Sequence, residues 1–136
     1  MNIDGERYMN ILVLGQGGRE SAIAYSLSKC SGVKNVFVLP GNDGMKVYAQ
    51  VVPSIKVLDF EKIKEFSIIN KIETIIVGPE IPLINGIKDY FNNYNIKVFG
   101  PDKNSAQLEG SKIFAYEFMI RHSIPTAKFD KFYIKN

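Results

Sequence analysis

The chain has 136 residues, of which 46% are hydrophobic and 23% charged, with a formal net charge of +3. This composition is typical of one globular domain, and the scattered lysines argue against a nucleic-acid partner. A single cysteine excludes an internal disulfide and a cysteine metal site, and no apolar run is long enough to cross a membrane. Residues 1–8 lack the apolar stretch of a signal peptide, so we expect them to be a loose extension of a cytoplasmic protein.

Short apolar runs alternate with helical patterns along the rest of the chain. The predicted strands span residues 11–14, 35–39, 74–77 and 97–99. The predicted helices span residues 19–29, 60–70, 83–93 and 111–121, with Asp59 as the expected N-cap of the second. Each strand is almost continuously apolar, as strands covered on both faces are. The alternation therefore predicts the α/β class, with a doubly wound, mainly parallel sheet and helices on both faces.

The pattern changes near the C-terminus. Residues 128–134 resemble a strand rich in aromatic side chains, with no crossover helix after it and no obvious place in the predicted sheet. We therefore expect residues 9–101 to form an N-terminal α/β domain. Residues 102–136 are expected to hold linker helices and the first strand of a second, truncated domain.

The first predicted strand ends in a glycine-rich run, Gly15-Gln16-Gly17-Gly18-Arg19-Glu20, which opens the first helix. Glycines let backbone N–H groups approach a ligand closely, and the first N–H groups of a helix have no intrahelical acceptor. The run therefore favours an anion site, although a tight turn without a ligand would also use glycines. A dinucleotide fingerprint fits less well, because Glu20 occupies its third glycine position and the second strand ends in Pro40-Gly41-Asn42 without a carboxylate.

Unusual residues also follow the other predicted strands. The turns are Pro40–Gly44, Gly78–Pro82 and Gly100–Pro101. Because ligands of open α/β sheets bind at the carboxyl edge of the strands, these turns indicate one shared crevice. Gly-Pro sequences also make ordinary chain reversals, but that explanation does not account for Glu80 in the middle of one turn.

Taken in order, these segments resemble the N-terminal part of the phosphoribosylamine–glycine ligase family of the ATP-grasp superfamily. The matching segments are Gly15–Glu20, Pro40–Asn42 with Gly44, Ile76–Glu80 with Pro82 and Leu83, Gly86–Ile87, Phe99–Pro101, Ala106–Lys112 and Ile124–Ala127. They span nearly all of residues 9–128. The resemblance implies a pre-ATP-grasp, Rossmann-like N-terminal domain that binds substrate.

The resemblance also implies an activity. The family joins glycine to 5-phosphoribosylamine at the expense of ATP, through an acyl phosphate, giving glycinamide ribonucleotide in purine biosynthesis. It uses ATP with Mg²⁺ or Mn²⁺, whose sites would lie mostly in an ATP-grasp domain of the same or a separate chain. We therefore expect no catalytic residue and no metal ligand in this chain, and no ligase activity from it alone.

The resemblance assigns a substrate site to the turns at the sheet edge. Its residues are Gly17, Gly18, Arg19, Glu20, Pro40, Gly41, Asn42, Gly78, Pro79, Glu80 and Pro82. The glycines and Arg19 would line the phosphoribosyl group, although Arg19 could instead pair with a carboxylate of the fold. Glu80 would accept hydrogen bonds from ribose hydroxyls, or it could be a solvated loop acid. Lys112 would reach the ATP phosphates, or it could be an ordinary exposed helix lysine.

Two residues depart from the family pattern. Ser21 stands where the family usually has histidine, and Met45 stands where a threonine is usual. Two other functions stay open from the sequence: an NAD(P)-binding Rossmann module of an oxidoreductase, and a non-catalytic remnant or partner that docks on a grasp domain encoded elsewhere.

Overall fold

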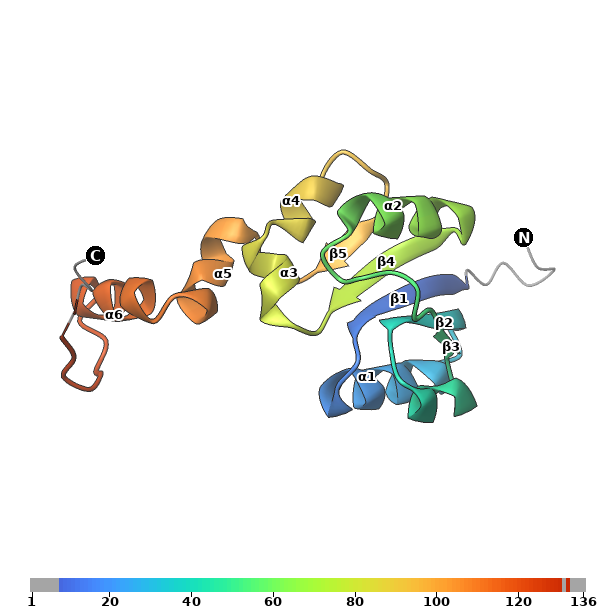
Figure 1. The fold of residues 1–136 in the computed structure, drawn as a ribbon, viewed down its shortest axis with the longest axis horizontal. Helices are drawn as coiled ribbons and strands as arrows, with labels where there is room; N and C mark the ends of the chain where they lie inside the picture. The colour runs from blue at the N-terminus through green and yellow to red at the C-terminus, as the bar shows by residue number, and fades with distance from the viewer. Residues whose placement is uncertain (1–7, 131, 133–136) are drawn as a thin grey trace.

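The computed structural model describes residues 8–130 and 132 and contains a five-stranded, entirely parallel sheet in the order β3-β2-β1-β4-β5 (Figure 1). The strands are β1 (Met9–Gly15), β2 (Val33–Pro40), β3 (Gln50–Val51), β4 (Ile72–Val77) and β5 (Lys97–Phe99). The helices are α1 (Gly18–Ser28), η1 (Asp43–Val47), α2 (Phe60–Ile69), α3 (Glu80–Ile84), α4 (Ile87–Phe91), α5 (Lys103–Gly110) and α6 (Lys112–Arg121). The predicted doubly wound α/β fold is confirmed.

Two apolar clusters cover the two faces of the sheet. Leu12 and Leu14 of β1 belong to the larger cluster, which α2, α3, α4 and α5 complete. Val13, between them, belongs to the smaller cluster with residues of α1 and η1. Successive side chains of a strand point to opposite faces, so the continuous apolar run of β1 is explained by burial on both sides.

Strand β1 lies at the centre of the sheet, with Leu12 opposite Phe37 of β2 and Ile75 of β4. The chain moves outward from β1 in one direction through β2 and β3, and in the other through β4 and β5. The order of the strands therefore reverses beside β1, and ligands of such sheets bind at the carboxyl edge at that point.

The opposite, amino-terminal end of the sheet carries a row of side-chain amides. Asn35 Nδ2 donates to Asn10 Oδ1 at 2.9 Å, and Asn10 Nδ2 donates to the carbonyl of Asn70 at 2.8 Å. Asn10 also stands where the pairing of β1 shifts against both β2 and β4. These amides join three segments of the chain at one end of the sheet.

Three sequence expectations differ from the structure or lie outside it. The helix predicted over 83–93 is two short helices, because Gly86 adopts φ 83°, in the left-handed region that glycine favours. The strand predicted over residues 128–134 is not seen at residues 128–130 and 132, and its other three residues lie outside the described part of the chain. Most of the predicted N-terminal extension, residues 1–7, also lies outside it. The N-cap expected at Asp59 is confirmed, since its side chain accepts a bond from Lys62 N at 3.2 Å.

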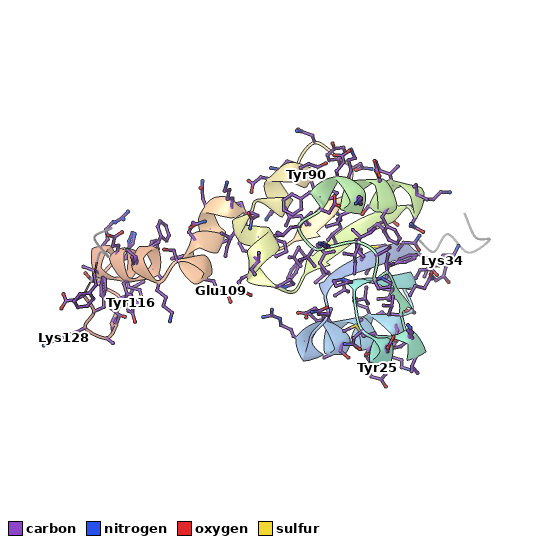
Figure 2. All side chains as sticks on the ribbon, viewed as in Figure 1. Tyr25, Lys34, Tyr90, Glu109, Tyr116 and Lys128 are labelled. Carbon is purple, nitrogen blue, oxygen red and sulfur yellow. The ribbon has the colours of Figure 1, made fainter. Side chains whose placement is uncertain are left out.

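Helices α5 and α6 lead away from the sheet (Figure 1). Helix α6 has no buried residue, and Figure 2 shows Tyr116 at the far end of the molecule from Lys34. The segment after α6 folds back on it, with the Phe129 ring stacked on Tyr116 at 4.4 Å between centroids. Among the described residues, no helix is long and apolar enough to cross a membrane.

Candidate functional site

The turns after β1, β2 and β4 meet at the carboxyl edge of the sheet, where backbone bonds join them. Gly41 N donates to the carbonyl of Gly15 at 3.0 Å, and Gly78 N donates to the carbonyl of Leu14 at 3.0 Å. Asn42 Nδ2 adds a bond to the carbonyl of Gln16 at 2.8 Å. The turns after β1, β2 and β4 are therefore bonded to one another at this edge. The fourth turn of the predicted crevice, Gly100–Pro101, instead accepts a bond from Lys88 Nζ at the carbonyl of Gly100, at 2.8 Å.

Glu20 lies inside this structure, with a relative exposure of 5%. Its Oε2 accepts a hydrogen bond from Gly17 N at 2.8 Å, which is the reciprocal half of an N-terminal capping box. Its side chain also fills the space beside two glycines, Gly15 at the end of β1 and Gly78 directly after β4. A Cβ built on Gly78 would lie 2.1 Å from Glu20 Oε1, and one on Gly15 would lie 2.4 Å from Glu20 Cγ. The carboxylate that interrupts the dinucleotide pattern is thus a packing and capping group.

Arg19 joins the first turn to the third. Its Nε donates to Glu20 Oε1 at 3.1 Å, and its Nη2 donates to the carbonyl of Gly78. The pairing of Arg19 with a carboxylate, left open by the sequence, is therefore present in the structure. Two of the three guanidinium nitrogens are engaged within the fold, although the Arg19 side chain is 61% exposed.

A cavity of about 360 Å³ opens beside the glycine loop. Its lining residues are Gly15, Gln16, Gly17, Glu20, Pro40, Pro53, Ile55, Lys56, Val57 and Pro79. Four of the predicted substrate residues line it, from the turns after β1, β2 and β4. The wall formed by residues 53–57 was missed by sequence reasoning. The available signal was its place directly after β3, whose carboxyl end meets the same edge.

The other predicted substrate residues do not line the cavity. Gly41 has φ 68°, and a Cβ there would lie 2.9 Å from Val51 Cγ1, so this turn requires glycine. Gly18 has open space where a Cβ would be. Pro82 is buried in α3, whereas Glu80 is exposed at the start of that helix and its side chain forms no hydrogen bond or ion pair with another described residue.

The two departures from the family pattern have structural roles here. Ser21 Oγ lies 2.6 Å from Tyr48 OH, which joins α1 to the end of η1. Met45 is fully buried and packs in the smaller cluster with Ala24 and Val38. The Met45 side chain therefore points into the core and contributes no group to the cavity.

Lys112 begins α6 and is exposed. It does not line the cavity, and α6 leads away from the sheet edge (Figure 1). Within residues 8–130 and 132, no three His, Cys, Asp or Glu side chains gather as a metal site would require. The described part of the chain therefore presents one arrangement suited to a ligand among the predicted residues, the glycine-loop cavity.

Comparison with known proteins identifies the family of most of the chain. Residues 9–109 match the family described as phosphoribosylglycinamide synthetase, N domain. The chain is 47% identical over 124 residues to a phosphoribosylamine–glycine ligase of Caldanaerobacter subterraneus subsp. tengcongensis, covering 91% of the chain and 30% of that relative. It is 46% identical over 125 residues to the ligase of that name from Pasteurella multocida, covering 91% of the chain and 29% of the relative.

Solved structures give the same picture of the fold. The crystal structure of phosphoribosylamine–glycine ligase from Thermotoga maritima superimposes with a TM-score of 0.63 at 33% identity, over 90% of this chain and 27% of that one. The biotin carboxylase domain of a thermophilic 2-oxoglutarate carboxylase superimposes with a TM-score of 0.66 over 88% of this chain and 29% of that one, at 18% identity, a likeness of fold alone. The chain spans about 30% of the length of the curated relatives it matches.

Proposed function

Because the chain belongs to the phosphoribosylglycinamide synthetase N-domain family, we propose that it supplies the sugar-phosphate site of a phosphoribosylamine–glycine ligase. The observation that carries this proposal is the convergence of Gly17, Pro40 and Pro79 on one cavity at the point where the strand order reverses. The three residues come from three separate strand ends, so the cavity is a product of the fold and not of one local turn.

The whole reaction is proposed for a protein of which this chain forms a part, since the chain covers about 30% of its relatives. In that reaction the glycine carboxylate would attack the γ-phosphate of ATP, which forms glycyl phosphate and releases ADP. The amine of 5-phosphoribosylamine would then attack the acyl carbon, displace inorganic phosphate and lose a proton. Bound Mg²⁺ or Mn²⁺ would neutralise the phosphates of ATP. Within that reaction, the contribution that we propose for this chain is to bind and orient the sugar phosphate.

The amides at the start of α1 are the proposed donors to the phosphate. Gly17 N is already bonded to Glu20, whereas Gly18 N and Arg19 N begin the helix and have no intrahelical acceptor. Apart from its chain neighbours and the backbone of its own helix, nothing lies within 4 Å of the Cβ position of Gly18, so an oxygen can approach the backbone there. The helix dipole would add about 0.3–1 kcal/mol for an anion at this end.

Glu80 is the proposed acceptor for the ribose hydroxyls. It follows Pro79, which lines the cavity, and its carboxylate is exposed and uncommitted to another described residue. A carboxylate can accept from two hydroxyls at once. Three further statements stay predictions: that Lys112 binds ATP, that an ATP-grasp domain of the same or another chain is the partner, and that the protein is cytoplasmic.

The test is a titration of the ¹⁵N-labelled chain with ribose 5-phosphate, followed by amide chemical shifts. We expect shifts at Gly17 and Gly18, with ribose alone producing much smaller ones. Glu80→Ala should weaken the binding of ribose 5-phosphate and leave the binding of inorganic phosphate unchanged. Glu65→Ala, which removes an exposed acid on α2, is the control and should change the binding of neither ligand. A loop that responds to NADH and ignores ribose 5-phosphate would overturn the proposal in favour of a dinucleotide module.

A second measurement addresses the activity of the isolated chain. With glycine, 5-phosphoribosylamine, ATP and Mg²⁺, we expect no phosphate release above the rate without protein. Release that depends on both substrates would contradict the view that this chain contributes binding alone.

A further inference from the structure

The wall of residues 53–57 is held firmly beside the glycine loop. Val52 N donates to the carbonyl of Val38 at 2.9 Å, which fixes the start of the segment to β2. Ile55 and Val57 are half-buried and pack against the larger core cluster. Lys56, between these two anchored residues, is exposed and lines the cavity. The fold therefore presents this lysine beside the glycine loop at a defined position.

Some charged side chains beside the cavity already pair with each other, and one does not. Glu20 and Arg19, the charged pair of the glycine loop, bond to each other at 3.1 Å, and Arg19 Nη2 also donates to Gly78. This pair contributes no net charge to an incoming anion. In the described part of the chain, the Lys56 side chain forms no hydrogen bond or ion pair with another residue. Lys56 can therefore bind an anionic ligand without giving up a hydrogen bond or ion pair to another described residue.

Asp59 is the nearest candidate to compete for Lys56. Its carboxylate is bonded to Lys62 Nζ at 3.0 Å and to Lys62 N at 3.2 Å. The hydrogen bond from Lys62 is the main cause that lowers the pKa of Asp59, and the charge of Lys56 is a minor one. Asp59 is thus already satisfied by Lys62 as the N-cap of α2, and Lys56 stays available.

We propose that Lys56, and not Arg19, supplies the cationic contact to the phosphate of the sugar phosphate that binds in this cavity. The inference rests on the proposed function and adds to it a second phosphate-binding element, on the segment between β3 and α2. Arg19 then acts as a positioning residue, which holds the turn after β4 against the glycine loop. A lysine suits the first role as a mobile point charge on a flexible stem.

The test compares the affinity of the chain for ribose 5-phosphate in Lys56→Ala, Lys56→Arg and Lys34→Ala, measured by calorimetry at two salt concentrations. Lys34 is also exposed, but lies at the amino-terminal end of the sheet, away from the cavity (Figure 2). Loss of one charged contact should weaken binding by about tenfold in Lys56→Ala. Lys56→Arg should keep most of the affinity because it retains the charge, and Lys34→Ala should keep all of it.

The salt dependence separates a charge contact from a structural effect. Wild type should lose affinity on going from low to high salt, and Lys56→Ala should lose clearly less, since one ion contact is already missing. Arg19→Ala should keep the wild-type salt dependence. If wild type binds ribose 5-phosphate and Lys56→Ala binds it equally well, this inference fails while the proposed function stands. If wild type does not bind it, both fail.

Discussion

A methyl group at Gly78 should expel Glu20 from its place beneath the glycine loop. The three atoms nearest to a Cβ at this position all belong to Glu20, at 2.1, 2.4 and 2.5 Å, and real Cβ contacts are not that short. The backbone of Gly78 does not adopt a left-handed φ, so Gly78→Ala brings no backbone strain and its shortest contacts are with the Glu20 side chain.

The cost can be worked from two contributions. Forcing extra atoms into a filled site costs about 1–3 kcal/mol, and losing the bond from Glu20 to Gly17 N costs about 1 kcal/mol as a lost helix cap. We therefore expect Gly78→Ala to lower the free energy of unfolding by about 2–4 kcal/mol. Gly18→Ala is the matched control, because no atom lies within 4 Å of its Cβ position. It should change stability by less than about 0.5 kcal/mol.

The assay is urea unfolding followed by circular dichroism, arranged as a double-mutant cycle with Glu20→Ala. Once the Glu20 side chain is gone, the new methyl has room, and Gly78→Ala should then cost less than about 1 kcal/mol. The two changes should therefore couple by roughly 1–3 kcal/mol. Equal destabilisation by Gly78→Ala in both backgrounds would refute the assignment of Glu20 as the group that fills this space.

Three further predictions concern stability. Ser67→Ala should leave the free energy of unfolding unchanged or raise it by about 1 kcal/mol, because Ser67 Oγ is buried with no partner among the described residues. A decrease of more than about 1 kcal/mol in urea unfolding would instead reveal a hydrogen bond to the hydroxyl. Met45→Thr, which restores the usual family residue, should lower stability by about 2–4 kcal/mol, since Met45 is fully buried; a more stable variant by thermal unfolding would contradict its place in the core. Asp59 has a pKa below its ordinary value because Lys62 donates to it, so its contribution to stability is fully present above about pH 4 and is lost as the pH falls through the lowered pKa. The difference in unfolding midpoint between wild type and Asp59→Ala should accordingly shrink in acid, and a difference independent of pH would count against the bond.

Four of the five strands were predictable because their causes are local, whereas the two-residue strand β3 was not predicted. The apolar runs of β1, β2 and β4 and the glycine and proline turns after them are visible in the sequence, and parallel pairing then brings those turns to one edge. The assignments of substrate roles to Glu80 and Lys112 go beyond what the fold tests and stay predictions.

The role of Glu20 was not predictable in the same way. Its burial depends on Gly15 and Gly78, which come together only when β1 pairs with β4. The same holds for Lys56, whose position depends on Ile55 and Val57 reaching a core made by distant segments. Gly86 was visible in the sequence, but glycine adopts positive and negative φ with similar ease, so its left-handed conformation between α3 and α4 was not.

The asparagine row at the amino-terminal end of the sheet has a consequence for folding specificity. Because β1 is apolar toward both faces, sliding it by one residue would still bury apolar side chains, and hydrophobic burial alone discriminates weakly against that misfolded alternative. The paired amides of Asn10 and Asn35 would be separated by such a slide and left without their partners. A slide would also move Gly15 out of reach of Glu20, so polar contacts at one end of the strand protect the geometry of the cavity at the other.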